Sequence, residues 1–233
     1  FKQTVYGTSG TIDGLIAGNQ YIITVCAQGV DSSKKAFLGE VSDYVSGKTT
    51  GTKISGIKAS ERENTSLTLS WYLIDGCESY NIFKYDAQAN EYQFIGQTFN
   101  NQNTFKVTGL KDASEYKFKV RANKANVACE ESDVFATVTM PKRVSNKSVK
   151  SRSTRKITYS FKKVNASGYE YQWSTYRNFK YNFKTKTTKS TRVTIKTAQS
   201  RKRYYVRVRA YKLDENKNKV YGSWSKVKSV KVR

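Results

Sequence analysis

Residues 204–210 read Tyr204-Tyr205-Val206-Arg207-Val208-Arg209-Ala210, and apolar and polar side chains alternate along them with a period of two. One face of an extended chain then carries Tyr204, Val206, Val208 and Ala210, and the other carries the two arginines. This alternation is typical of a β-strand that is buried on one side.

The same pattern occurs twice more along the chain. Residues 116–122 read Tyr-Lys-Phe-Lys-Val-Arg-Ala and residues 21–27 read Tyr-Ile-Ile-Thr-Val-Cys-Ala. The first tyrosines of the three stretches are 95 and 88 residues apart. A repeat of this length predicts an array of small domains. We place the units at residues 1–50, 51–141 and 142–233.

Strand-forming residues dominate each unit. Val, Thr and Tyr recur between turns rich in Asn, Gly, Ser and Asp, and no window carries a helical apolar stripe. Residues 51–141 and 142–233 each contain seven short strand candidates. We therefore expect an all-β chain of tandem antiparallel β-sandwiches.

Charge is distributed very unevenly. The chain carries +24, but residues 142–233 hold 28 Lys and Arg against three acids, whereas residues 1–141 hold 14 against 15. A strongly basic domain joined to a near-neutral half indicates a polyanionic partner for that domain.

The composition gives no support to an enzyme. The chain has no His and only three Cys, which lack C-x-x-C spacing, and it has no Gly-rich phosphate loop. The adjacent Glu130 and Glu131 are a poor acid pair for hydrolysis. With Asp133 they could hold calcium, but a solvated loop is the simpler interpretation. We expect no catalytic site, metal or cofactor. No apolar run is long enough to span a bilayer, so we expect no membrane insertion.

Residues 51–141 resemble a fibronectin type III domain. The resemblance is carried by Leu67-Thr68-Leu69-Ser70-Trp71, by Ser79-Tyr80-Asn81-Ile82, and by Leu110 six residues before Tyr116. It implies a two-sheet sandwich of immunoglobulin-like topology with Trp71, Tyr80 and Leu110 in its core.

The outer units depart from this pattern. Phe161 and Ala198 stand where the middle unit has Trp71 and Leu110. Residues 204–211 and 219–228 resemble basic repeat domains near the C-termini of secreted surface proteins of Gram-positive bacteria. Tyr21 has only 20 residues before it, so we expect the first unit to lack its first three strands. The rest of a parent polypeptide N-terminal to Phe1 would supply them; completion by a separate chain is the less favoured alternative.

The fold that the resemblance implies places Cys77 and Cys129 in two loops at one end of the sandwich. We expect a disulfide between them, the alternative being two ordinary thiols. The partner of Cys26, if it has one, stays undecided.

Exposed aromatic residues suggest a second kind of site. Trp224 follows a Gly-Ser pair and should stack on Arg207 and Arg209 as a cation–π ladder. A sugar contact by Trp224, Tyr176 and Tyr181 is the alternative.

These observations favour a non-catalytic extracellular spacer or adhesion module of a bacterial surface or secreted protein. Its basic domain should bind anionic cell-wall polymer or a host glycan or protein, and nucleic acid is disfavoured by the extracellular setting that the resemblance implies. Two alternatives stay open: an accessory tail of a secreted hydrolase with an upstream catalytic domain, and a specific protein- or carbohydrate-binding module. The expected polyanion-binding cations are Arg201, Lys202, Arg203, Arg207 and Arg209, and we expect all five side chains to be exposed.

Overall fold

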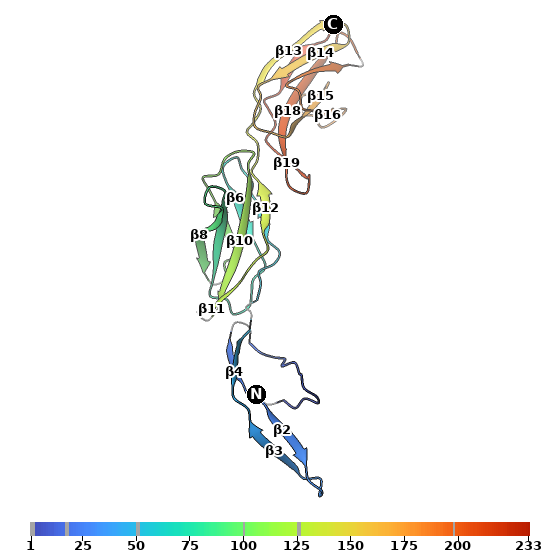
Figure 1. The fold of residues 1–233 in the computed structure, drawn as a ribbon. Coiled ribbons are helices and arrows are strands. Elements are labelled where there is room, and N and C mark those ends of the chain that lie inside the picture. The colour runs from blue at the N-terminus through green and yellow to red at the C-terminus, as the bar shows by residue number, and fades with distance from the viewer. Residues whose placement is uncertain (1–2, 17–18, 50–51, 100, 125–126, 198) are drawn as a thin grey trace.

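Every regular element of the described chain is a β-strand. The computed structural model describes residues 3–16, 19–49, 52–99, 101–124, 127–197 and 199–233. Within these ranges there is no helix of the length and apolarity needed to cross a membrane. Three units follow one another along the molecule, from the N-terminal unit in blue to the C-terminal unit in red (Figure 1).

The middle unit is a two-sheet sandwich. One sheet has the order β5-β6-β9, and the other has the order β11-β10-β7-β8 with β12 also paired to β10. Trp71, Tyr80 and Leu110 lie in the core between the sheets, as predicted, together with Phe118 and Val120 of the repeat strand. The strands of this unit are β5 (Lys58–Ser60), β6 (Leu67–Ser70), β7 (Ser79–Asp86), β8 (Glu91–Phe99), β9 (Thr104–Val107), β10 (Glu115–Lys124), β11 (Val127–Glu131) and β12 (Phe135–Val138).

The C-terminal unit repeats this topology. Its sheets have the orders β13-β14-β17 and β16-β15-β18-β19, with β20 also paired to β18. Phe161 occupies the core between them and packs on Tyr159 and Tyr169. The strands of this unit are β13 (Asn146–Ser153), β14 (Lys156–Phe161), β15 (Gly168–Ser174), β16 (Lys184–Thr188), β17 (Arg192–Lys196), β18 (Arg203–Leu213), β19 (Lys219–Tyr221) and β20 (Lys228–Lys231).

The N-terminal unit contains two short strand pairs. β1 (Gln20–Ile23) pairs with β4 (Val45–Lys48), and β2 (Cys26–Val30) pairs with β3 (Ala36–Val41). Together they form a broken hairpin equivalent to β10 with β11 and β12. Val25 is 64% exposed, whereas its counterparts Val120 and Val208 in the other units are fully buried. The apolar side of this hairpin is therefore open to solvent at Val25, while Tyr21 and Ile23 on the same side are partly buried.

A serine repeats at the same place in all three units. Its hydroxyl accepts a hydrogen bond from the backbone N–H of a valine in the repeat strand, and its own N–H donates to that valine's carbonyl. The reciprocal bonds satisfy the backbone where the hairpin ladder is interrupted. The three pairs are Val25–Ser42, Val120–Ser132 and Val208–Ser225.

Some sequence expectations were wrong in detail. Cys129, Glu130 and Glu131, which were expected in a loop, lie in β11, and residues 219–221 form the additional strand β19. The repeat stretch 21–27 is interrupted at Thr24 and Val25 instead of forming one strand. The boundary placed between residues 50 and 51 and the substitution at Ala198 both lie outside the described residues.

The middle and C-terminal units are joined by direct contacts. Asp112 forms an ion pair of 3.2 Å with Lys142, and its carbonyl accepts a 3.2 Å hydrogen bond from Asn165 Nδ2. Asn64 Nδ2 donates to the carbonyl of Pro141 at 2.8 Å. An added Cβ at Gly222 would come within 2.5 Å of that same carbonyl, so the backbones approach closely here. We call these contacts the junction.

Candidate functional site

A stack of rings and guanidinium groups covers the outer face of the larger C-terminal sheet. The Trp224 ring lies between Arg207 and Arg209, whose Cζ atoms are 4.3 and 4.4 Å from its centroid. Beyond Arg207 lies Phe179 at 4.2 Å, and beyond Arg209 lies Tyr221 at 3.7 Å. These five residues form a continuous cation–π ladder, and the stacking predicted for Trp224 is confirmed.

A row of acceptors on β15 anchors the ladder. The strand register places Glu170 opposite Arg209 and Gln172 opposite Arg207. Arg207 Nε donates to Gln172 Oε1 at 2.8 Å, and Arg209 Nε donates to Glu170 Oε1 at 2.8 Å. Tyr221 Oη donates to Glu170 Oε2 at 3.1 Å. The guanidinium planes are thereby fixed from below while the rings stack on their faces.

Burial changes the acidity of the ladder groups. Burial lowers the pKa of Arg207, and the neighbouring charge of Arg209 lowers it further, while Glu170 opposes the shift. Burial also raises the pKa of Tyr221, and its hydrogen bond to Glu170 adds to the increase. Arg207 and Arg209 are therefore structural cations, since their Nε donors are bonded to β15 and their guanidinium groups are stacked on aromatic rings.

The five cations expected to bind a polyanion differ in their exposure to solvent. Arg201, Lys202 and Arg203 are exposed in and beside the loop before β18. The expectation that Arg207 and Arg209 are exposed was wrong, because Trp224 and its neighbours cover them and leave them half-buried. The structure therefore does not bring the five side chains together as one accessible patch.

Sequence reasoning found Trp224 and the two arginines but missed the other ladder members. Phe179 and Tyr221 come from a loop and from β19, and neither has a local pattern that marks it. Glu170 had a usable signal, because it is the only acid between residues 142 and 213 and has the same outward parity as Arg209 in a neighbouring strand.

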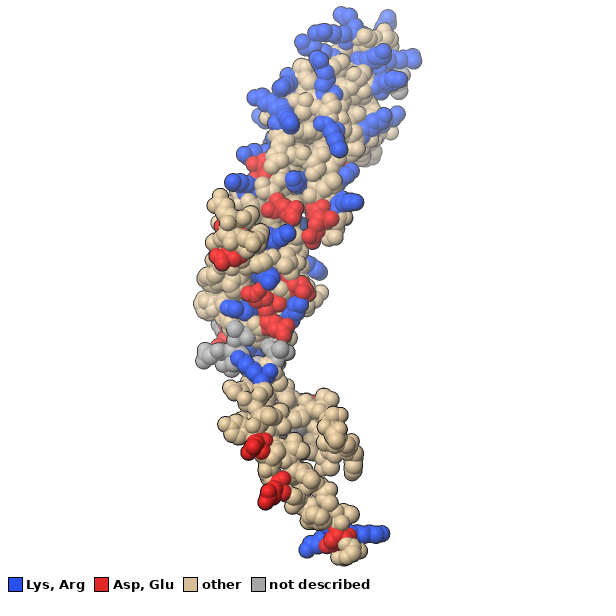
Figure 2. All heavy atoms as spheres, viewed as in Figure 1, with Lys and Arg blue, Asp and Glu red and all other residues tan. Residues whose placement is uncertain are grey.

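The C-terminal unit carries many Lys and Arg residues and only three acids. On the face shown in Figure 2, the upper part of the molecule is covered by Lys and Arg, and the acids lie lower down. Of the three acids in this unit, Glu170 belongs to the ladder, and Asp214 and Glu215 occupy the turn between β18 and β19.

Two tyrosines proposed for sugar binding do lie together. Tyr176 and Tyr181, 48% and 64% exposed, meet edge to face with ring centroids 6.3 Å apart. Their loop is held by buried Ser174, which accepts from Tyr176 N and donates to Tyr181 O, and by Phe179 beneath Arg207. Trp224 is not part of this pair, since both of its faces are occupied in the ladder.

The cysteines are present as thiols in the structure. Cys77 Sγ donates to the carbonyls of Ser79 and Asn123 at 3.0 and 3.3 Å. Cys129 is buried on β11, not in a loop, and burial and the nearby Cys77 raise its pKa. The expected disulfide is thus not formed in this structure, although Cys77 packs against the core cluster to which Cys129 belongs. Cys26 is also a free thiol.

The acidic residues considered for calcium do not gather. In the parts of the chain that the structure describes, no group of three His, Cys, Asp or Glu side chains could hold a metal ion. Glu131 instead pairs with Lys119 at 2.9 Å, and Asp133 pairs with Lys53 at 2.6 Å.

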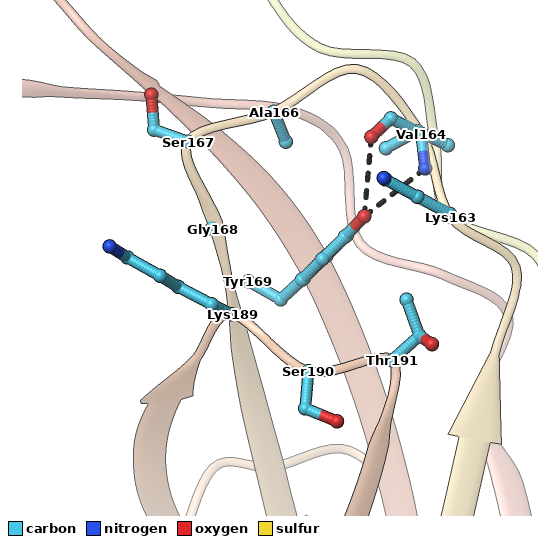
Figure 3. A pocket seen from close by; sticks show the side chains of 9 residues that line it. All are labelled: Lys163, Val164, Ala166, Ser167, Gly168, Tyr169, Lys189, Ser190 and Thr191. Carbon is cyan, nitrogen blue, oxygen red and sulfur yellow. Dashed lines mark hydrogen bonds between the residues drawn. The ribbon is translucent and has the colours of Figure 1, made fainter.

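A hollow of about 450 Å³ in the C-terminal unit is lined by residues 163–164, 166–169 and 189–191 (Figure 3). Tyr169 Oη extends into it and is bonded to the backbone N–H and carbonyl of Val164. Lys163 and Lys189 stand at its rim, and no acid lines it. The Tyr169 hydroxyl is therefore already occupied by backbone bonds.

The match to a family model agrees with the sandwich architecture of the middle unit. Residues 52–138 match the family model of the fibronectin type III domain. Among solved structures, the chain is similar to the chicken CNTN1 FN1–FN3 domains, with 14% identity, a TM-score of 0.44, and coverage of 94% of this chain and 79% of that one. It is also similar to a segment of two fibronectin type III domains from chicken tenascin, with 15% identity, a TM-score of 0.40, and coverage of 76% and 99%. No curated protein matches the sequence.

Proposed function

We propose that this all-β chain of tandem sandwiches of fibronectin type III topology is a non-catalytic extracellular spacer and binding module of a bacterial surface or secreted protein. Its C-terminal unit binds anionic polymers, either those of the cell wall or host glycosaminoglycans. The observation that carries the proposal is the charge of residues 142–233, where 28 cations face three acids and Glu170 is already paired with Arg209.

The positive charge of the C-terminal unit would be balanced by an anionic ligand outside the chain. Repulsion among so many cations destabilises a compact domain, and an inert spacer would gain nothing from it. An anionic polymer would be attracted over the screening length, about 8 Å at physiological salt, and would release its counterions on binding. Such binding depends strongly on salt and little on stereochemistry.

The junction supports the spacer role. An ion pair, hydrogen bonds from Asn64 and Asn165, and the close approach of Gly222 to Pro141 restrict rotation between the two sandwiches. A spacer with this restriction holds its basic unit away from the rest of the chain.

The test is retention of the whole chain on immobilised heparin and on purified wall polymer across a salt series, with uncharged dextran as the control matrix. Retention on both anionic matrices should be strong at 0.05 M salt and fall steeply by about 0.2 M. Equal retention on dextran, or retention indifferent to salt, would contradict the proposal.

A second candidate is a specific carbohydrate site at Tyr176 and Tyr181. The rigid, exposed tyrosine pair favours it, since sugar rings stack on aromatic faces. Neutral oligosaccharides should then bind at high salt, where polyanion binding is lost, and Tyr181→Ala should abolish this binding.

A further inference from the structure

The outer face of the β13–β14–β17 sheet carries a regular array of cations and hydroxyls. The register places Ser148, Ser160 and Arg192 in one row, and Lys150, Thr158 and Thr194 in the next. Lys156 lies directly opposite Lys196 in a third row. We call these eight residues the basic face. Its four cations are exposed, and the residues that alternate with them along the strands, such as Ile157, Tyr159 and Val193, are core.

The basic face has no acidic partner. β13, β14 and β17 contain no Asp or Glu. None of Lys150, Lys156, Arg192 and Lys196 forms an ion pair among the residues that the structure places. Like charges directly opposite each other in a sheet are destabilising. The Lys156–Lys196 pair therefore costs stability, and within the described part of the chain no ion pair with an acid offsets that cost.

The fold itself does not require these cations. The equivalent sheet of the middle unit, β5–β6–β9, has only Lys58 and Lys106 on its outward rows. There the outward hydroxyl of Thr68 also donates to Glu61 Oε2 at 2.8 Å, so an acid lies beside the face. The two units share a topology, and only the C-terminal unit has an acid-free basic face.

The dimensions and chemistry of the face indicate its ligand. Arg192 and Lys196 are four residues apart on one strand, which spans roughly 13 Å at the usual rise, so one small anion cannot reach both. Hydroxyls of Ser and Thr fill the positions between the cations and can both donate to and accept from sugar hydroxyls. The face has no aromatic side chain on which a nucleic-acid base could stack.

We propose that the basic face is the polymer-binding site and that its ligand is a linear anionic polysaccharide. This inference rests on the function proposed above and deepens it, because it assigns the binding to one sheet and away from Arg207 and Arg209. The polymer lies across the three strands, with its anionic groups at the four cations and its hydroxyls over the serine and threonine rows.

The test compares two full-length variants that lose the same charge. The first replaces the basic-face cations by threonine, as K150T, K156T, R192T and K196T. The matched control is K180T, K184T, K186T and K189T, which removes four exposed cations from β16 and its flanking loops. Threonine is favourable in strands, and heparin is the probe. Thermal unfolding of each variant checks that its fold is intact.

The slope of log Kd against log salt measures the number of cation–anion contacts, with a change of about one for each contact removed. The basic-face variant should lower the slope by about four, and the control should change it by less than about one. The milder double variant K156Q/K196Q should lower it by about two, and it serves as the test if the fourfold variant unfolds.

Each outcome decides a separate point. If the wild-type chain binds no anionic polymer at low salt, the proposed function fails. If both fourfold variants lose binding equally, polyanion binding stands but the assignment to this face is overturned. If polyphosphate or duplex DNA of matched total charge competes as well as heparin, the hydroxyl rows contribute nothing and the polysaccharide assignment is wrong.

Discussion

Arg209 Nη2 lies 2.7 Å from Glu170 Oε1, and the two side chains are only 26% and 11% exposed. This pair anchors the ladder to β15, because the same carboxylate also accepts from Tyr221. Removal of its charge should therefore affect both the stability of the C-terminal unit and the acidity of Tyr221.

Glu170→Gln tests this relationship. The variant keeps an acceptor but leaves Arg209 half-buried without a counter-charge, so the C-terminal unit should lose about 1–3 kcal/mol, less than for a fully buried pair. The pKa of Tyr221 should fall, since Glu170 helps to raise it. Denaturant unfolding in a Trp71→Phe background, which leaves Trp fluorescence only in the C-terminal unit, and ultraviolet titration of tyrosine measure the two effects. An unchanged midpoint would show that the pair contributes nothing.

Trp224→Ala should destabilise the C-terminal unit by about 2–4 kcal/mol. The change removes cation–π contacts with Arg207 and Arg209, each of about 1 kcal/mol, as well as apolar surface that covers both arginines. Trp224→Phe should recover part of the loss, and Tyr181→Ala, at an exposed ring outside the ladder, should change stability by less than about 0.5 kcal/mol. Trp fluorescence measured in the Trp71→Phe background, where Trp173 is the one tryptophan left by Trp224→Ala, reports the unfolding. Equal effects of Trp224→Ala and Tyr181→Ala would contradict a stabilising ladder.

The C-terminal unit should lose stability at alkaline pH. Burial raises the pKa of Tyr159 to about 12, above the value of roughly 10 in an unfolded chain. The folded state therefore favours the neutral phenol. The resulting stabilisation is complete below pH 10 and is lost between pH 10 and 12, by about 2–3 kcal/mol.

The control for this pH effect is Tyr159→Phe, which cannot ionise at that position. The difference in unfolding free energy between wild type and Tyr159→Phe should be constant from pH 8 to 9.5 and should shrink above pH 10. A difference that stays constant up to pH 12 would remove Tyr159 as the cause.

Cys77 and Cys129 are expected to form a disulfide under oxidising conditions. Cys77 Sγ bonds to the carbonyl of Asn123, whose register partner Ala128 directly precedes Cys129. An oxidant such as oxidised glutathione would accept the two electrons and two protons released. Intact mass should fall by two hydrogens in wild type and stay unchanged in Cys77→Ser. Cys26 is only partly covered, so it should be blocked by alkylation before the oxidant is added. Three alkylated thiols after prolonged oxidation would exclude the disulfide.

The junction should limit bending between the middle and C-terminal units. The double variant Lys142→Ala/Asn165→Ala removes the ion pair and the hydrogen bond to Asp112. Both sandwiches keep their separate cores, so unfolding should change by less than about 0.5 kcal/mol. Small-angle X-ray scattering should nevertheless show a broader distribution of end-to-end distances. Scattering identical to that of wild type would mean that the other junction contacts, at Asn64, Pro141 and Gly222, are sufficient to fix the angle between the two units.

The sequence alone determined the strands and their inward faces. Alternation in residues 116–122 and 204–210 correctly placed Val120 and Val208 inside and the arginines outside, because side-chain parity along a strand is a local property. The sequence also predicted core aromatic residues, and Trp71 and Tyr80 lie in the core as expected.

Only the tertiary structure decided how the surfaces are assembled. Phe179, Arg207 and Tyr221 meet through strand register and through a loop in which Phe179 has φ of 56°, and no local pattern encodes either. The same register places Lys156 against Lys196 from strands about forty residues apart. Arg207 and Arg209 were correctly predicted to point outward, but whether an outward side chain is free or covered depends on which distant residues pack on it. Local alternation determines the direction of a side chain, and long-range packing determines its environment.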